Sequence, residues 1–101
     1  MSAETVRAAI AGTGVTEASL RTAVAARAAG GPPTTEPYEQ LARQIGAASY
    51  RVTDADIDAV RQATGSDKGT FEIVLSACAG AGLARWDAAA RVIQEASDAS
   101  A

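Results

Sequence analysis

The chain has 101 residues, of which 48% are hydrophobic, 4% aromatic and 21% charged, and its formal net charge is −3. Nine basic and twelve acidic residues leave no basic stripe of the kind that nucleic-acid backbones attract, so we expect no nucleic-acid partner. The longest apolar run, residues 73–84, is interrupted by serine and glycine and is shorter than the ~20 residues that span a bilayer. No membrane partner is therefore expected.

The N-terminal segment lacks the continuous apolar stretch of a secretory signal, because Glu4 lies near its start. The single cysteine, Cys78, cannot form an intramolecular disulfide. Both observations predict a cytoplasmic location. The chain has no histidine and its acidic residues are scattered, so neither a metal site nor a cofactor is expected.

Residues 1–29 are predicted to form an N-terminal helical hairpin. Ser2 is a suitable N-cap for a first helix over residues 3–11, and two glycines follow it. Thr16 is a suitable N-cap for a second helix, which is expected to end at the glycine pair 30–31.

Residues 30–37 are rich in glycine and proline, which do not continue a helix, and are predicted to form a linker. Residues 38–98 are predicted to form the helical core, which makes one domain with the hairpin. Its first helix is expected to begin near Thr35. The apolar face of that helix comprises Tyr38, Leu41 and Ile45.

The next helix has clear signals at both ends. Thr53 is its predicted N-cap, Asp56 occupies the position that completes a capping box, and Gly65 ends it. Asp54 and Asp56 lie in the first turn, where carboxylates complement the helix dipole. We interpret these two acids as capping residues rather than catalytic ones.

A long apolar helix is predicted after Ser66. The 3/4 spacing predicts one apolar face, which comprises Phe71, Val74, Leu75, Cys78 and Gly82 and is continued by Leu83, Trp86, Ala89 and Ile93. The glycines within this run predict a break or kink at residues 80–85. Because no segment alternates with period two, the predicted fold class is all-α, an antiparallel bundle of five or six helices.

The segment 49–93 combines a capped helix, a turn and a helix that begins with Phe-Glu at 71–72. In this order it resembles the helical core of the AhpD-like/carboxymuconolactone decarboxylase superfamily. The resemblance implies an all-helical antiparallel bundle that usually assembles into dimers, trimers or hexamers. Enzymes of that family carry Cys-x-x-Cys-x-x-x-His before the turn. Counting back without gaps places these three positions on Ser49, Val52 and Asp56.

None of these three residues is a thiol or an imidazole, so we assign no catalytic residue and expect no thiol peroxidase activity. The resemblance implies that the remaining cleft is lined by Ser49, Tyr50, Arg51, Asp56 and Glu72. Two interpretations of Glu72 are open. It is either a first-turn carboxylate paired with Arg51, Arg61 or Arg85, or a pocket acid with a raised pKa.

Cys78 is predicted to be a small buried hydrophobic residue, because no basic side chain lies at helical spacing to lower its pKa. Trp86 is expected in the core or at a subunit interface. An alanine-rich core of this size buries little apolar area, which favours a homo-oligomer, a dimer or larger. The interface candidates are Gly80, Gly82 and Trp86.

Two functions are compatible with these features. The first is a non-catalytic AhpD/carboxymuconolactone decarboxylase-like helical module that acts through self-assembly or protein partners. The alternative is a divergent enzyme or small-molecule binder of the same type, a peroxidase-like oxidoreductase or a decarboxylase, that uses the residual cleft.

Overall fold

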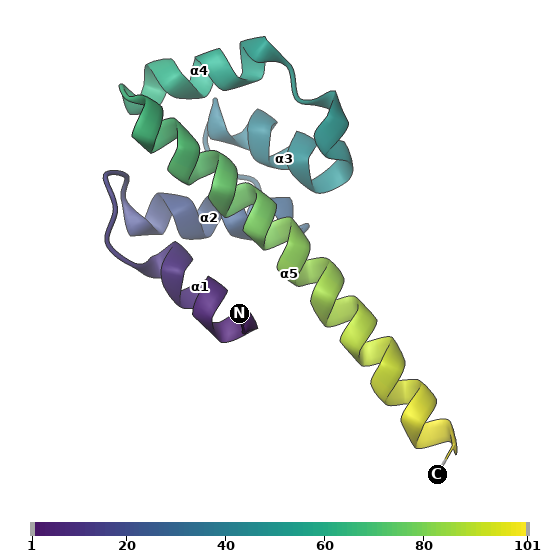
Figure 1. Cartoon of the computed structure of the whole chain (residues 1–101). Coiled ribbons are helices and arrows are strands. Elements are labelled where there is room, and N and C mark those ends of the chain that lie inside the picture. The colour runs from purple at the N-terminus through teal and green to yellow at the C-terminus, as the bar shows by residue number, and fades with distance from the viewer. Residues whose placement is uncertain (1, 101) are drawn as a thin grey trace.

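A computed structural model describes residues 2–100, and the described residues form helices and connecting turns without any strand (Figure 1). The elements are α1 (Ala3–Ala11), α2 (Ala18–Ala28), α3 (Tyr38–Ala48), a 3₁₀-helix η1 (Ser49–Arg51), α4 (Asp54–Thr64) and α5 (Asp67–Ser100). The predicted all-α fold class is confirmed.

One apolar core joins α2, α3, α4 and α5. Its buried members are Val24, Ala28, Leu41, Ala42, Ile45, Val60, Ile73, Ala77 and Ala81. The predicted hairpin and the predicted helical core both contribute to it. The face of α3 predicted from spacing is confirmed, because Leu41 and Ile45 are buried and Tyr38 packs against the cluster.

Small residues let these helices approach closely. A Cβ atom at Gly80 would collide with the backbone carbonyl of Ala25 in α2, and one at Gly46 would collide with that of Ala28. Gly80 is thus needed for a contact within the chain, because only a residue without a Cβ atom lets α5 lie this close to the backbone of α2.

Three of the predicted helix signals are present in the structure. The Ser2 hydroxyl accepts a hydrogen bond from the backbone N–H of Thr5. Thr53 and Asp56 form a complete capping box, and Gly65 adopts a left-handed conformation with φ 79° at the end of α4.

Two helix starts were predicted wrongly. Thr16 does not cap α2, which begins at Ala18 after Glu17 without a side-chain cap. The third helix begins at Tyr38 rather than near Thr35, although the Thr35 carbonyl accepts a hydrogen bond from the Glu39 N–H. The Thr16 hydroxyl is instead used in a contact with α5.

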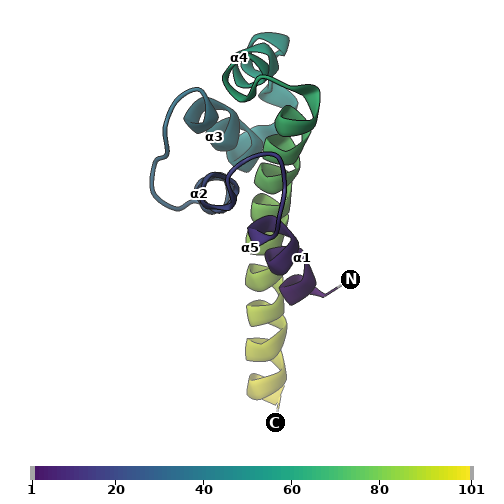
Figure 2. The same ribbon diagram turned by 90° about the vertical axis from the view of Figure 1, so that its left-hand side faces the viewer.

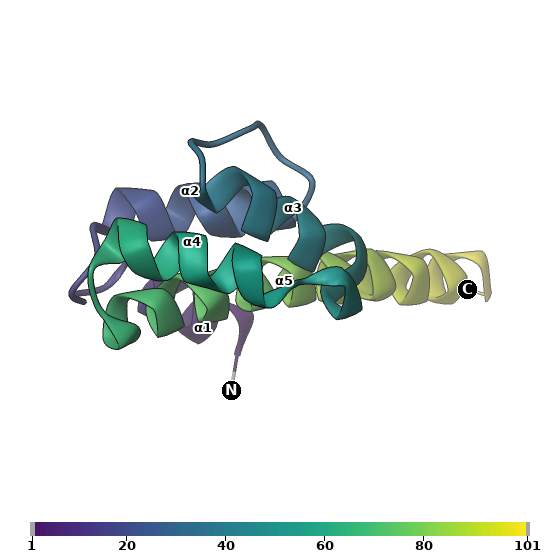
Figure 3. The same ribbon diagram turned by 90° about the horizontal axis from the view of Figure 1, so that it is seen from above.

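The helix α5 is continuous, so the predicted break at residues 80–85 is wrong. Gly80 packs against α2, and the alanines around both glycines sustain the helix. A helix of 34 residues is about 51 Å long, which sets the longest of the molecular extents, 54 × 28 × 21 Å. Figures 1 and 3 show its C-terminal half extending beyond the other helices.

The side of α5 that faces the core is not the predicted one. Ile73, Ala77 and Ala81 are buried, whereas Phe71 and Leu75 are largely exposed. The spacing rule failed because α5 has apolar residues on two opposite sides, and spacing alone does not tell which side other helices cover. Figure 2 shows α2 and α3 packed along only one side of its upper half.

Candidate functional site

The residues predicted to line a residual cleft do not lie together. Ser49, Tyr50 and Arg51 form the exposed 3₁₀-helix, where the Tyr50 residue is 83% exposed. The Arg51 guanidinium lies 5.8 Å from the centre of the Tyr50 ring. Asp56 accepts the Thr53 N–H at 3.0 Å as part of the capping box.

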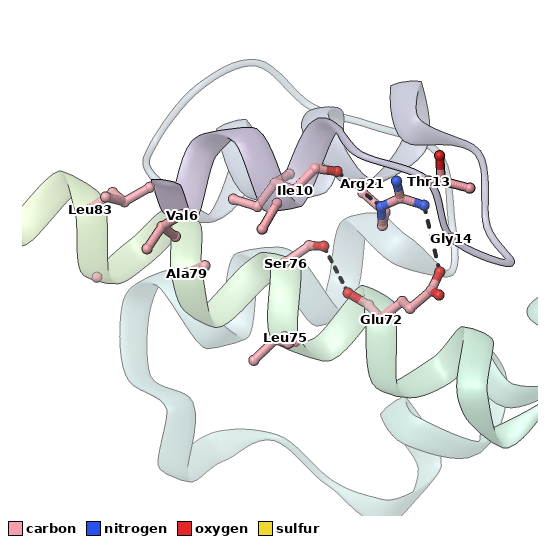
Figure 4. A pocket seen from close by; sticks show the side chains of 12 residues that line it. Val6, Ile10, Thr13, Gly14, Arg21, Glu72, Leu75, Ser76, Ala79 and Leu83 are labelled. Atoms are coloured by element: carbon pink, nitrogen blue, oxygen red, sulfur yellow. Dashed lines mark hydrogen bonds and ion pairs between the residues drawn. The ribbon is translucent and has the colours of Figure 1, made fainter. Parts of the chain in front are cut away.

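Glu72 alone among the five lines the groove between α1 and α5, which has a volume of about 590 Å³ (Figure 4). We call it the α1–α5 groove. Its lining is almost entirely apolar: Val6, Ala9 and Ile10 from α1, and Leu75, Ala79, Gly82 and Leu83 from α5. Of the polar lining residues, Thr13, Arg21 and Glu72 lie at one end, beside the loop that joins α1 to α2. Ser76, one turn after Glu72 in α5, is the fourth.

The Glu72 carboxylate is saturated with donors from that loop. The Val15 N–H donates to Oε2 at 3.0 Å, and the Thr16 N–H donates to Oε1 at 3.0 Å. The Thr16 hydroxyl donates to the same Oε1 at 2.6 Å. This contact explains why Thr16 does not cap α2.

Arg21 completes the network from the other side, and its side chain is only 5% exposed. Its Nη1 lies 3.5 Å from Glu72 Oε1 and also donates to the Thr16 carbonyl. Its Nε donates to the Ile10 carbonyl at 3.0 Å, and Nη2 donates to the Gly12 carbonyl. Arg21 therefore satisfies carbonyl groups at the C-terminal end of α1.

These bonds lower the pKa of Glu72 from its ordinary value of 4.5 to about 2. The largest cause is the Thr16 hydroxyl, followed by the backbone N–H groups of Val15 and Thr16, and the Arg21 charge adds to them. The interpretation of Glu72 as an acid with a raised pKa is therefore wrong. Glu72 is ion-paired, but with Arg21 rather than with Arg51, Arg61 or Arg85.

The loop comes so close to this ion pair that one position excludes a side chain. A Cβ atom at Gly14 would lie 2.7 Å from both Arg21 Nη1 and Glu72 Oε2. The Arg21–Glu72 network therefore links α1, the loop, α2 and α5. Among the described residues, no buried side-chain nitrogen or oxygen is left without a hydrogen-bond partner. The polar atoms of Arg21 and Glu72 are therefore used in holding these four parts of the chain together.

Cys78 is exposed, and the prediction that it is buried is wrong. It lies on the side of α5 opposite the core, together with other exposed apolar residues. We call these residues the α5 stripe: Phe71, Leu75, Cys78, Gly82, Trp86, Ala89 and Ile93. The average step between them is roughly 3.7 residues, close to the 3.6 of a straight helix, so the stripe stays on one side over its whole length.

The large members of the α5 stripe are all more than half exposed: Phe71 65%, Leu75 54%, Trp86 65% and Ile93 67%. Trp86 was predicted in the core or at an interface, and its exposure excludes the core of this chain. Every residue from Arg85 to Ala99 is exposed. The stripe thus continues onto the part of α5 that extends beyond the other helices.

Gly82 lies near the middle of the stripe, and a Cβ atom there would have no other atom within 4 Å. Nothing within the chain requires glycine at this position, in contrast to Gly80 two residues earlier.

The described residues contain no group of three or more histidine, cysteine, aspartate or glutamate side chains arranged to hold a metal ion. None of the helices in residues 2–100 has both the length and the apolar character needed to cross a membrane. Searches against family models, curated proteins and solved structures give no match for this chain.

Proposed function

We propose that this chain is a non-catalytic helical module that acts through self-assembly along the α5 stripe. The observation that carries the proposal is that α5 is apolar on two opposite sides, and the helices of this chain cover only one of them. An apolar helix face is normally covered by other parts of the protein or by a partner.

The C-terminal half of α5 supports the same proposal. Every residue from Arg85 to Ala99 is exposed. Isolated helices shorter than about 12–15 residues are marginal in water, because most helix stability in proteins comes from packing an apolar face. A second copy packed against Trp86 and Ile93 would supply that packing.

The exposed area is sufficient for a specific contact. Phe71 and Trp86 are each 65% exposed, so each offers roughly 100–160 Å² of apolar surface. With the other stripe residues, two copies together offer on the order of 1,000 Å², the lower limit for a specific interface.

A non-catalytic role is supported by the use of the polar groups at the groove. Glu72 and Arg21 bind each other and the loop 12–16, and the low pKa keeps Glu72 ionised. An AhpD-like relationship is part of the proposal. The capped helix α4, the turn at Gly65 and the helix bearing Phe71 and Glu72 occur in the order that the resemblance implies.

The experiment compares two substitutions that add the same charge to the extended half of α5. Ile93→Glu places a carboxylate in the α5 stripe, and Ala88→Glu places one on another side of the helix. We expect wild type and Ala88→Glu to associate with rising concentration in sedimentation equilibrium, and Ile93→Glu to stay monomeric. A wild-type chain that is monomeric at every concentration contradicts the proposal.

A second candidate function is the binding of a small apolar molecule, which the α1–α5 groove favours. Its volume of about 590 Å³ falls within the 300–1,000 Å³ typical of ligand sites. The assembly state distinguishes ligand binding from self-assembly, because ligand binding requires a groove that no second copy fills. A monomeric wild type that binds a fluorescent apolar probe, with Val6→Asn weakening that binding, would favour it over self-assembly.

A further inference from the structure

Gly82 marks the place on α5 where another helix comes closest. Glycine in an exposed helix interior is less favourable than alanine, and a Cβ atom at this position would meet nothing within the chain that requires glycine. A second backbone at short distance gives a reason for the residue, because a side chain here would hold the two helices apart.

We infer that two copies pair antiparallel along the α5 stripe, with Gly82 facing the partner's Gly82 at a two-fold axis, and that Trp86 of each copy fills the α1–α5 groove of the other. This inference rests on the self-assembly proposed above and gives it a defined geometry. The partner copy then completes the groove.

The antiparallel register pairs two of the four large stripe residues, Leu75 and Trp86, with smaller ones. Each stripe residue faces the one that lies equally far on the other side of Gly82. The resulting pairs are Phe71 with the partner's Ile93, Leu75 with the partner's Ala89, and Cys78 with the partner's Trp86. No stripe residue is charged, so this contact buries no charge from the stripe.

The shape of the molecule favours this direction over a parallel one. The N-terminal half of α5 carries the other helices, whereas the C-terminal half extends beyond them. Antiparallel pairing lays the extended half of one copy on the stripe of the other copy's N-terminal half. Parallel pairing would bring the two sets of helices together at one end and would align the helix dipoles unfavourably.

The position of Trp86 around the helix directs it to the groove. At about 100° per residue, Trp86 is turned about 40° from Gly82, toward the side of Ala79 at about 60°. Ala79 and Leu75 line the α1–α5 groove together with Val6 and Ile10 of α1 (Figure 4). A two-fold axis that is perpendicular to both helices and passes between them places the groove side of both copies on the same side of the pair. The partner's Trp86 therefore lies at the same height along α5 as Cys78, beside the groove.

The first measurement uses Trp86 as a reporter, since it is the single tryptophan of the chain. We expect its emission to shift to shorter wavelength as the wild type associates. We also expect acrylamide quenching to fall severalfold below that of the monomeric Ile93→Glu variant. Val6→Asn makes the groove wall polar and should reverse the shift in the dimer. Ala8→Asn, on the same helix but outside the lining of the α1–α5 groove, should not.

The second measurement tests the register by oxidative cross-linking with copper phenanthroline. In the antiparallel pair the two Cys78 residues are separated by about 12 Å along the helix, too far for a disulfide. Wild type should therefore give no disulfide-linked dimer. The double variant Gly82→Cys, Cys78→Ser should give one. The added side chain weakens the pairing, but it meets nothing within its own chain, and each time two copies meet, the thiols at position 82 face each other and the disulfide traps the contact.

A dimer in which wild-type Cys78 cross-links, or in which Trp86 stays as accessible as in Ile93→Glu, overturns the inferred geometry and leaves self-assembly in place. A wild-type chain that never associates overturns the inference and the proposed function together. Cross-linking at position 82 alone, with Trp86 shielded and sensitive to Val6, supports it.

Discussion

Glu72 and Arg21 connect four parts of the chain through hydrogen bonds to backbone groups. Glu72 holds the N–H groups of Val15 and Thr16, and Arg21 holds carbonyls at the end of α1. The side chain of Arg21 is 5% exposed and that of Glu72 is 17% exposed, so solvent weakens these bonds little.

The pKa of Glu72 predicts an acid-sensitive part of the stability. Because folding lowers this pKa from 4.5 to about 2, the ionised carboxylate stabilises the fold fully above about pH 4.5 and loses this effect as the pH falls through about 2. We expect Glu72→Gln to lower the free energy of unfolding at pH 7. The difference from wild type should shrink steadily in chemical denaturation series taken from pH 5 toward pH 2.

Glu39 provides the control for that series, because its pKa is also lowered, chiefly by its hydrogen bond to Arg27. Both wild type and Glu72→Gln retain that contribution, so it cancels in their difference. A difference that is independent of pH would show that Glu72 stabilises the fold without its charge.

Thr53 offers a second test at the scale of a residue. Its hydroxyl accepts the Asp56 N–H at 3.2 Å in the capping box of α4. Thr53→Ala should lower the free energy of unfolding by about 1 kcal/mol. Thr53→Ser keeps the hydroxyl and should lose less than half as much in urea denaturation. Equal losses in the two variants would assign the effect to the methyl group.

At the scale of elements, α5 contains two glycines with opposite roles. Gly80 is pressed against the backbone of α2, whereas Gly82 has open space around it within the chain. In the Ile93→Glu background, where association does not interfere, Gly80→Ala should cost about 1–3 kcal/mol through overpacking. Gly82→Ala should gain about 0.5–1 kcal/mol. Urea denaturation of both variants measures the contrast, and a loss of stability in both would place Gly82 in an intrachain contact.

Local signals predicted the short elements well. The cap at Ser2, the capping box of Thr53 and Asp56 and the glycine stop at Gly65 depend on neighbouring residues alone, and all three are present. Signals that depend on distant residues failed. The Thr16 hydroxyl was predicted as a cap, but Glu72, 56 residues away, takes it as a donor.

The same distinction explains the candidate site. Helical spacing identified the apolar residues of α5, but it did not show that Ile73 faces the core while Phe71 and Cys78 are exposed. Arg21 was missed altogether. Its only signal is a charge next to Leu20 and close to Val24 on an apolar helix, and a solvated arginine gives the same signal.

At the scale of the whole molecule, α5 determines the shape. The radius of gyration is 14.9 Å, whereas a compact chain of this length has about 13 Å. The excess comes from the extended C-terminal half of α5 (Figure 3). A shape of this kind exposes more apolar surface than a rounded domain, and association is the direct way to cover it.

Association should make thermal stability depend on concentration. We expect the melting temperature of wild type to rise with protein concentration. Trp86→Ala should weaken association by about 2 kcal/mol, as expected for an interface anchor, and reduce this dependence. Val92→Ala also truncates an exposed apolar residue, 63% exposed, but it lies beside the α5 stripe and should have a smaller effect. Equal effects of the two substitutions in sedimentation and melting would argue against a contact centred on the stripe.

The weak attachment of α1 has a consequence for motion. None of its residues is buried, and it is held by the Arg21 carbonyl contacts and by the Arg7–Asp87 ion pair at 2.9 Å. Such an element opens locally at a lower free energy than the whole fold. Amide hydrogens in α1 should therefore exchange with solvent faster than those in α3. If the partner's Trp86 occupies the groove, association should slow exchange in α1 more than in α3, so the opening of α1 and the pairing of two copies are thermodynamically coupled.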